Sequence, residues 1–225
     1  MDSTAFFWRF DAVLPYLTYL LAGVKMTVAV SVASIMLALV LGLFVALARM
    51  SRLAPMRAAA GLYIDIWRST PTLAQLLWIY YALPILVGIP LNVFVTGMIA
   101  LGCHYSAYLA EIYRAGILAV PSGQTQGALA LGMTKLQMLR RVLLPQAMTM
   151  MLPLIASQFV TLFKESALLS MISLEELMWH AQSLAGFTMR SVEVFTVTAL
   201  LYMALTYPQT LIVNWLHRRA VISVR

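Results

Sequence analysis

Four long stretches of this chain contain no Asp, Glu, Lys or Arg, and they limit its possible folds more than any other feature. They hold between 22 and 42 residues each and occupy 26–48, 69–110, 142–163 and 194–216. About 20 mostly apolar residues are enough for one helix to cross a bilayer. Since lipid offers exposed backbone groups no hydrogen-bond partners, an open sheet is excluded and helices are expected. The sequence predicts an all-α, polytopic membrane protein.

The composition agrees with a lipid environment. Hydrophobic residues make up 62% of the 225 and charged residues 10%, whereas a soluble domain is about a quarter charged. The N-terminus lacks the cationic start of a cleavable signal peptide, so we expect the first apolar stretch to remain as a span. Cys103 is the single cysteine and lies in an apolar stretch, so an internal disulfide is impossible.

The 42-residue stretch is too long for one helix, and Pro84, Gly88, Pro90 and Asn92 divide it into two. The sequence therefore predicts about five transmembrane helices in a single domain, 1–225, with no recognisable internal repeat. Their expected limits are about 18–48, 59–83, 92–113, 143–165 and 194–216.

The basic residues predict the orientation of these spans. With the N-terminus outside the cell, the inner segments hold eleven Lys and Arg and the outer segments hold four, Arg9, Lys25, Lys164 and Arg190. Cytoplasmic loops carry the excess of basic residues in membrane proteins. We therefore expect a periplasmic N-terminus and a cytoplasmic C-terminus, and we attribute the net charge of +7 to topology and not to nucleic-acid binding.

Two of the predicted spans carry small residues at every fourth position. These are Ala38, Gly42 and Ala46 in the first span, and Gly102, Ser106 and Ala110 in the third. Small residues at that period let helices approach closely in lipid. General bundle packing is favoured over a dedicated dimer face.

The segment 115–142 joins the third and fourth spans on the predicted cytoplasmic side. Pro121–Ser122 is typical of a helix start and Gly132 of a helix end. Thr134, with Gln137 three residues later, forms a capping-box pattern that begins another helix. Two short helices meeting at a glycine form an elbow, which either rests on lipid headgroups or docks on a cytoplasmic partner.

The elbow also carries a family motif. Gly123–Met133 reads GQTQGALALGM and Leu143–Ala147 reads LLPQA. This glycine spacing and Leu-Pro ending resemble the loop of permease subunits of ABC importers for polar amino acids, of the histidine, glutamine, arginine and glutamate–aspartate type. The family loop begins Glu-Ala-Ala, and Gln126 and Gly127 stand here in place of the Glu and the first Ala.

Further segments are similar to motifs of that family in the same order. They are Arg68–Pro71 (RSTP), Ala107–Glu111 (AYLAE), Ser157–Phe159 (SQF) and Lys164–Leu168 (KESAL). In the segments Leu14–Leu17 and Ala128–Met133, the sequence most resembles the glutamate–aspartate branch of the family.

The resemblance implies a type I ABC importer permease fold in the bacterial inner membrane, with the elbow as the coupling helix. The implied contacts with the ATPase are Gln126, Gly127, Ala128, Gly132, Leu144 and Pro145. Because the chain has no Gly-rich phosphate loop of the Walker type, ATP and Mg would be bound by a separate ATPase dimer, and this chain needs no cofactor. A second permease subunit, identical or a sister chain, and a periplasmic binding protein complete the implied partners.

Polar residues at membrane depth usually face a bundle interior or an aqueous path. Lys164 and Glu165 end the fourth span, where Thr161 shares a helical stripe with Lys164 and Gln158 shares one with Glu165. A neighbouring cation and anion suit a zwitterionic amino acid, so these four residues are candidates for the substrate path. The alternative is that Lys164 and Glu165 simply extend to the outer interface.

The second span adds Arg68 and Thr70 to the candidates for the path. Arg68 follows Asp65 by three residues at the expected cytoplasmic start of the span, where an ion pair between them is favoured over substrate contact. Thr70–Pro71 predicts a local irregularity whose freed carbonyl lines the path.

Three smaller features complete the expectations. Glu111 and Arg114 are expected to anchor the elbow. Ser173, with Glu176 three residues later, predicts a capping box that begins a short amphipathic helix on the outer surface, with a gate as the alternative. His104 is expected to be packed and hydrogen-bonded, because no cluster of His, Cys and carboxylates has the spacing of a metal site.

Two rival functions remain open at this stage. An intramembrane hydrolase would use Ser166 with Lys164, but residues two apart on a helix point away from each other, so no catalytic residue is expected. A secondary transporter would need an internal repeat and mid-membrane carboxylates, and neither is visible. The sequence does not name the amino acid.

Overall fold

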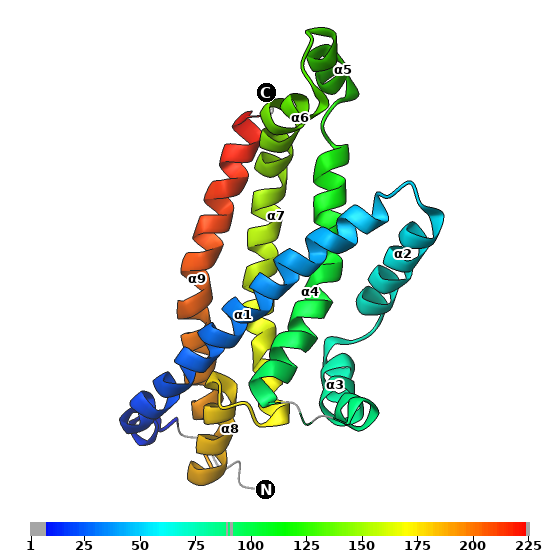
Figure 1. The fold of residues 1–225 in the computed structure, drawn as a ribbon. Coiled ribbons are helices and arrows are strands. Elements are labelled where there is room, and N and C mark those ends of the chain that lie inside the picture. Colours follow the sequence, from blue (N-terminus) through cyan, green and yellow to red (C-terminus); the bar gives the residue numbers. More distant parts are fainter. Residues whose placement is uncertain (1–7, 89, 91, 224–225) are drawn as a thin grey trace, which may run out of the picture.

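The computed structural model describes residues 8–88, 90 and 92–223, with side chains up to Arg219. These residues form helices and no β-strand, so the all-α prediction is confirmed. Four long helices run between the two ends of the molecule (Figure 1). They are α1, Leu17–Arg49; α4, Val93–Leu118; α7, Leu144–Glu165; and α9, Ser191–Ser223.

Each long helix is apolar enough to cross a membrane. With the short turns that continue them, they cover Phe10–Arg49, Val93–Leu118, Lys135–Ile172 and Ser191–Arg219. The turns before α1 are Phe10–Ala12 (η1) and Leu14–Tyr16 (η2). Four of the five expected spans fall inside these ranges.

The remaining expected span, 59–83, is not one helix. The structure has α2, Ala54–Ser69, and α3, Thr72–Val87, with a bend of 106° between them. Pro71 causes the break, because a residue before proline is pushed out of the helical region, and Thr70 is extended at φ −114° and ψ 145°. The irregularity at Thr70–Pro71 is therefore a sharp corner between two half-length helices.

The close approach of α1 and α4 explains the two stripes of small residues. A Cβ added to Gly42 would lie 2.9 Å from the carbonyl oxygen of Ser106, and one added to Gly102 would lie 2.6 Å from Leu37. Ala46 and Ala110 share a buried cluster. The stripes pack α1 on α4 within the same chain, as general bundle packing predicts.

The elbow consists of α5, Ser122–Ala130, and α6, Lys135–Met138, and a π-helical turn, Leu139–Leu143 (η3), connects it to α7. Gly132 lies between the two helices at φ 81°, a left-handed conformation that glycine adopts without strain. The capping box is confirmed, since the Thr134 N–H donates to Gln137 Oε1 over 2.9 Å and the Gln137 N–H to Thr134 Oγ1 over 3.3 Å. The elbow protrudes beyond the ends of the long helices (Figure 1).

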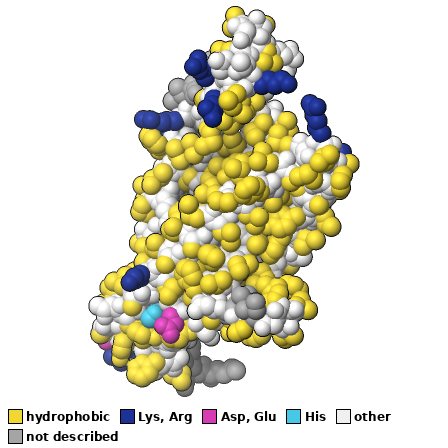
Figure 2. Space-filling model, viewed as in Figure 1, with side chains coloured by type: hydrophobic (Ala, Val, Ile, Leu, Met, Phe, Trp, Pro, Cys, Tyr) yellow, Lys and Arg dark blue, Asp and Glu magenta, His cyan; other side chains and the backbone are white. Residues whose placement is uncertain are grey.

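The opposite end of the molecule holds η4, Ser166–Ile172, and α8, Leu177–Thr188. The expected capping box at Ser173 is wrong, because Ser173 adopts φ 62° and Glu176 itself caps α8. Glu176 is also fully buried, so it does not belong to a helix lying on the outer surface. Figure 2 shows a hydrophobic belt between the two ends, with most of the visible Lys and Arg side chains at the elbow end.

Candidate functional site

The corner between α2 and α3 borders a partly open hollow of about 590 Å³. Its lining is mostly apolar and aromatic, with Trp67 and Trp78 among the residues, and its polar members are Thr70 and Gln75. A concave, mostly apolar site with a few placed polar groups is the usual form of a small-molecule site. This corner is therefore one wall of the candidate substrate path.

Gln75 donates hydrogen bonds to backbone carbonyl oxygens that the break between α2 and α3 leaves without a helical partner. Its side-chain amide donates to the carbonyl oxygens of Trp67 over 2.9 Å and of Thr70 over 3.2 Å, and it also contacts the Thr70 hydroxyl. Unpaired carbonyls are costly inside a membrane. The carbonyl that was expected to line the path at Thr70 is thus capped by Gln75 within the chain.

His104 of α4 ties this corner to the rest of the bundle. It is only 6% exposed, its Nδ1 lies 2.8 Å from Gln75 Oε1, and its Nε2 lies 3.3 Å from Thr72 Oγ1. Since an amide oxygen only accepts, Nδ1 carries the proton and Nε2 accepts from the Thr72 hydroxyl. His104 is packed and hydrogen-bonded as expected, and the described residues contain no group that could hold a metal ion.

Glu165 ends α7 on the other side of His104. One of its carboxylate oxygens, Oε2, is buried and has no hydrogen-bond partner within the described residues. Its carboxylate interacts with the side chains of His104 and Tyr105, which are both buried on α4. The structure therefore brings Glu165 next to the polar corner made by Gln75 and His104.

The other candidates on α7 are placed differently. Lys164 is exposed and forms no ion pair with Glu165 within the described residues. Gln158 is half-buried, and Thr161 is exposed with its hydroxyl donating to the Ser157 carbonyl oxygen over 3.2 Å. Lys164 and Glu165 are thus neighbours in different surroundings, with Lys164 exposed and Glu165, like Gln158, half-buried.

Arg68 differs from its expected position and partner. It is the fifteenth residue of α2, about 21 Å along the helix axis from Ala54, so it does not lie at the cytoplasmic start of the span. Its guanidinium lies 5.1 Å from the ring centroid of Tyr108. No salt bridge to Asp65 is present among the described residues.

The elbow presents most of its candidate residues to solvent. Gln126, Gly127, Gly132, Leu144 and Pro145 are exposed. Ala128 is only 5% exposed, so it packs inside the elbow and does not add to its outer surface. Near the end of α4, Arg114 donates to Glu111 over 2.7 Å, so these two residues pair within the helix that leads to the elbow, and their role as its anchor stays a prediction.

Glu176 is a further functional candidate, because the structure buries its carboxylate and the sequence did not predict this burial. Its carboxylate accepts from the Tyr202 hydroxyl over 2.7 Å and from the Trp179 N–H over 2.8 Å. Thr27 of α1 accepts from the Leu177 N–H over 3.1 Å. These contacts join α1, α8 and α9, whereas the sequence marked Glu176 only as the last member of the Ser173 capping-box pattern.

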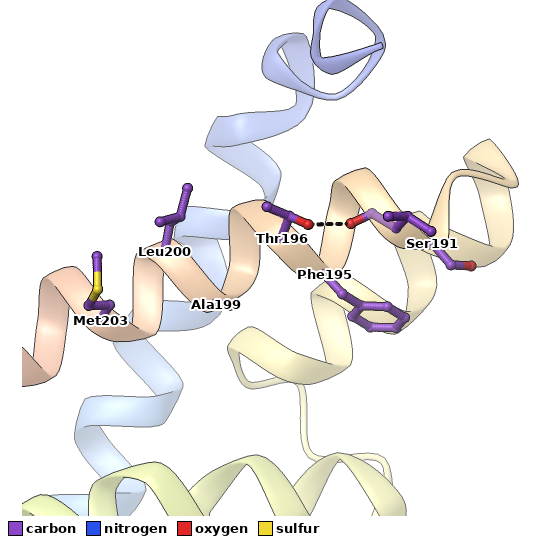
Figure 3. A pocket seen from close by; sticks show the side chains of 7 residues that line it. Ser191, Phe195, Thr196, Ala199, Leu200 and Met203 are labelled. Carbon is purple, nitrogen blue, oxygen red and sulfur yellow. Dashed lines mark hydrogen bonds between the residues drawn. The ribbon is translucent and has the colours of Figure 1, made fainter. Parts of the chain in front are cut away.

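A second hollow lies on the surface of α9 (Figure 3). Phe195, Leu200 and Met203 line it. Thr196 also lines it, but its hydroxyl donates to the Val192 carbonyl oxygen over 2.7 Å. This hollow offers few polar groups to an amino acid, so the corner at Gln75 is the better candidate.

The hydrolase alternative loses its geometric basis. Ser166 is fully buried and donates to the Phe163 carbonyl oxygen over 2.8 Å, whereas Lys164 is exposed. The two side chains have different surroundings, which a serine–lysine dyad does not allow.

A helical bundle with a corner in its second span and a protruding elbow defines a class, the transmembrane components of transport systems. The chain belongs to the family described as "binding-protein-dependent transport system inner membrane component", whose model matches residues 38–222.

Relatives and solved structures agree with this assignment. The arginine transport system permease protein ArtQ of Bacillus subtilis is 33% identical, over 93% of this chain and 96% of that protein. The glutamate/aspartate import permease protein GltK of Escherichia coli is 32% identical, over 94% of this chain and 99% of that protein. A crystal structure of an amino acid ABC transporter with histidines superposes with a TM-score of 0.88 at 34% identity, covering 95% of this chain and all of that chain.

A more distant structure shares only the fold. The MetNI methionine ABC transporter superposes with a TM-score of 0.76 at 22% identity, covering 92% of this chain and 98% of that chain. The predicted importer permease fold is thereby confirmed.

Proposed function

We propose that this chain is the transmembrane subunit of an ATP-driven importer that passes a polar amino acid across the bacterial inner membrane. The observation that carries the proposal is the family match over residues 38–222, supported by relatives whose names give arginine or glutamate and aspartate as substrates. Because those substrates carry opposite net charges, the proposal extends to polar amino acids as a class and keeps the glutamate–aspartate branch as its first candidate.

The proposed partners follow from the same family. An ATPase dimer supplies ATP hydrolysis with Mg, a second permease subunit completes the path, and a periplasmic binding protein delivers the amino acid. We propose that the elbow is the contact with the ATPase. Its exposed glycines support this, since a Cβ added to Gly127 or Gly132 meets no atom of the chain within 4 Å, which leaves room for a close partner surface.

The elbow assignment is tested by Gly132→Glu. A bulky charged side chain at a left-handed position strains the turn and obstructs a docking surface, so we expect loss of co-purification with the ATPase subunit and of ATP-driven uptake in proteoliposomes. Gly186→Glu on α8 is the matched control, because Gly186 is also exposed with no atom within 4 Å of an added Cβ. Normal association and uptake in Gly132→Glu would refute the coupling role.

For the substrate path we propose Glu165 as the central residue, with Gln158, Thr161, Lys164, Arg68 and Thr70 around it. Its buried, unpartnered oxygen supports a contact with the ammonium group of an amino acid. Removing a charged hydrogen bond costs about 1.5–3 kcal/mol, so Glu165→Gln should raise the KM for uptake roughly ten- to a hundredfold. Lys164→Gln should impair uptake less, because its side chain is exposed.

The control for this experiment is Glu175→Gln, which makes the same charge change at an exposed position of the outer end. Assembly with the ATPase should stay intact in all three variants. An unchanged KM in Glu165→Gln would remove Glu165 from the path.

A further inference from the structure

The turn between α1 and α2 carries three arginines, Arg49, Arg52 and Arg57, within nine residues. The sequence contains no Asp or Glu between Asp11 and Asp65. None of the salt bridges among the described residues involves the three arginines. Glu111 of α4 interacts with Arg49, whereas Arg52 and Arg57 form no ion pair within the described residues.

The hydrogen bonds within the turn use only a few of the guanidinium donors. Arg49 donates to the Arg57 carbonyl oxygen over 3.3 Å and lies against Gly61, where an added Cβ would be 2.9 Å from Nη1. Arg57 donates to the Ser51 carbonyl oxygen over 3.5 Å. Each guanidinium has five N–H donors, so Arg52 and Arg57, which are both exposed, retain donors for an external anion.

The turn lies beside the end of α4. Ala46, one turn before the end of α1, packs with Ala110 and Tyr113 of α4. The arginines that follow Ala46 are thus beside the last turns of α4, which ends at Leu118. The elbow lies farther out than this turn (Figure 1), so the turn is placed to meet headgroups while the elbow is placed beyond them.

Exposed apolar side chains flank the two exposed arginines. Leu53 follows Arg52 and Met56 precedes Arg57, and they are 60% and 46% exposed. Arginine heads beside exposed apolar side chains are the pattern of a surface that holds an anionic headgroup together with the apolar part of a lipid.

We propose that the α1–α2 turn binds an anionic phospholipid of the leaflet that faces the elbow. The phosphate is held by Arg52 and Arg57, and Leu53 and Met56 contact the apolar part of the lipid. A zwitterionic lipid binds more weakly, because its own ammonium group repels the arginines. This inference is independent of the proposed transport function.

The test is a lipid titration of the purified full chain in detergent, followed by native mass spectrometry with phosphatidylglycerol and, separately, phosphatidylcholine. The double variant Arg52→Gln/Arg57→Gln should lose roughly thirtyfold in apparent affinity for phosphatidylglycerol, on the basis of about 1 kcal/mol for each arginine near an anionic surface. Its affinity for phosphatidylcholine should change little. Arg52→Lys/Arg57→Lys should retain most of the binding, since it keeps the charge.

The matched control is Arg140→Gln/Arg141→Gln, which removes the same charge from exposed positions next to the elbow and should bind phosphatidylglycerol like the wild type. Equal binding of the two lipids by the wild type, or wild-type binding by the Arg52→Gln/Arg57→Gln variant, overturns the proposal. Displacement of the lipid by an equal concentration of inorganic phosphate would instead indicate a site for free anions. If the Arg52→Gln/Arg57→Gln variant loses co-purification with the ATPase while its lipid binding is unchanged, the turn is a protein contact and the lipid proposal is overturned.

Discussion

At the scale of single residues, Glu176 has the most unusual environment outside the candidate path. Its side chain is fully buried and accepts hydrogen bonds from Tyr202 and from the backbone of α8. Burial raises the pKa of the Glu176 carboxyl above its usual 4.5, and this outweighs the hydrogen bonds, which lower the pKa. The folded protein therefore holds this proton more tightly than the unfolded chain does.

The raised pKa of Glu176 has a defined effect on stability. As the pH rises, the unfolded chain releases the proton first, so the contribution of Glu176 to the free energy of unfolding is present below about pH 4.5 and is lost as the pH passes the folded pKa. We expect the thermal midpoint in detergent to fall with pH across this window, and Glu176→Gln to reduce that slope. Glu175→Gln, an exposed neighbour, should leave the slope unchanged, and equal slopes for wild type and Glu176→Gln would contradict the assignment.

The residues that sequence reasoning missed share a physical cause. Gln75 appeared as one polar residue in an apolar stretch, because its partners Trp67 and His104 lie 8 and 29 residues away and meet it only across the bend. Arg68 was expected to pair with Asp65 three residues earlier, yet it lies over Tyr108 of another helix. Spacing along the sequence predicts contacts between near neighbours, whereas Gln75 and Arg68 contact residues that are distant in the sequence.

At the scale of elements, the contact between α1 and α4 depends on glycine. A Cβ at Gly42 would lie 2.9 Å from a backbone oxygen of α4 and 3.0 Å from Leu109 Cβ, and backbone cannot move aside as a flexible side chain does. Gly42→Ala should therefore destabilise the bundle by about 1–3 kcal/mol, measured by thermal unfolding in detergent. Gly186→Ala in α8, where nothing lies within 4 Å, should instead stabilise by up to about 1 kcal/mol through helix propensity. A Gly42→Ala variant as stable as the wild type would show that the helices separate easily.

Element limits could be predicted where a local signal acts alone. Gly132 ends α5, and the capping box at Thr134 begins α6, because both features are completed by the nearest residues in sequence. The bend of 106° at Thr70–Pro71 could be located but not measured from the sequence, since proline fixes where a helix stops and packing fixes where the next one points. The same limit applies to Ser173, whose capping pattern was overridden when Glu176 became buried.

At the scale of the whole molecule, the apolar stretches were sufficient to predict the class of fold. The apolar stretches had to become helical, because lipid permits few alternatives. The basic residues gather toward one end, as the predicted orientation requires (Figure 2). The amino acid is not encoded in such global features. Under the proposed function it depends on the few groups around Glu165 and on partner surfaces outside this chain.

One consequence of the π-helical turn at Leu139–Leu143 concerns mechanics. The turn lies inside a helical stretch from Lys135 to Ile172, so α6 of the elbow and Glu165 share one continuous helix. An extra residue in a helical turn shifts the angular phase of everything after it by about 100°. Deleting one residue of this turn would therefore rotate the carboxylate of Glu165 by about that angle relative to α6.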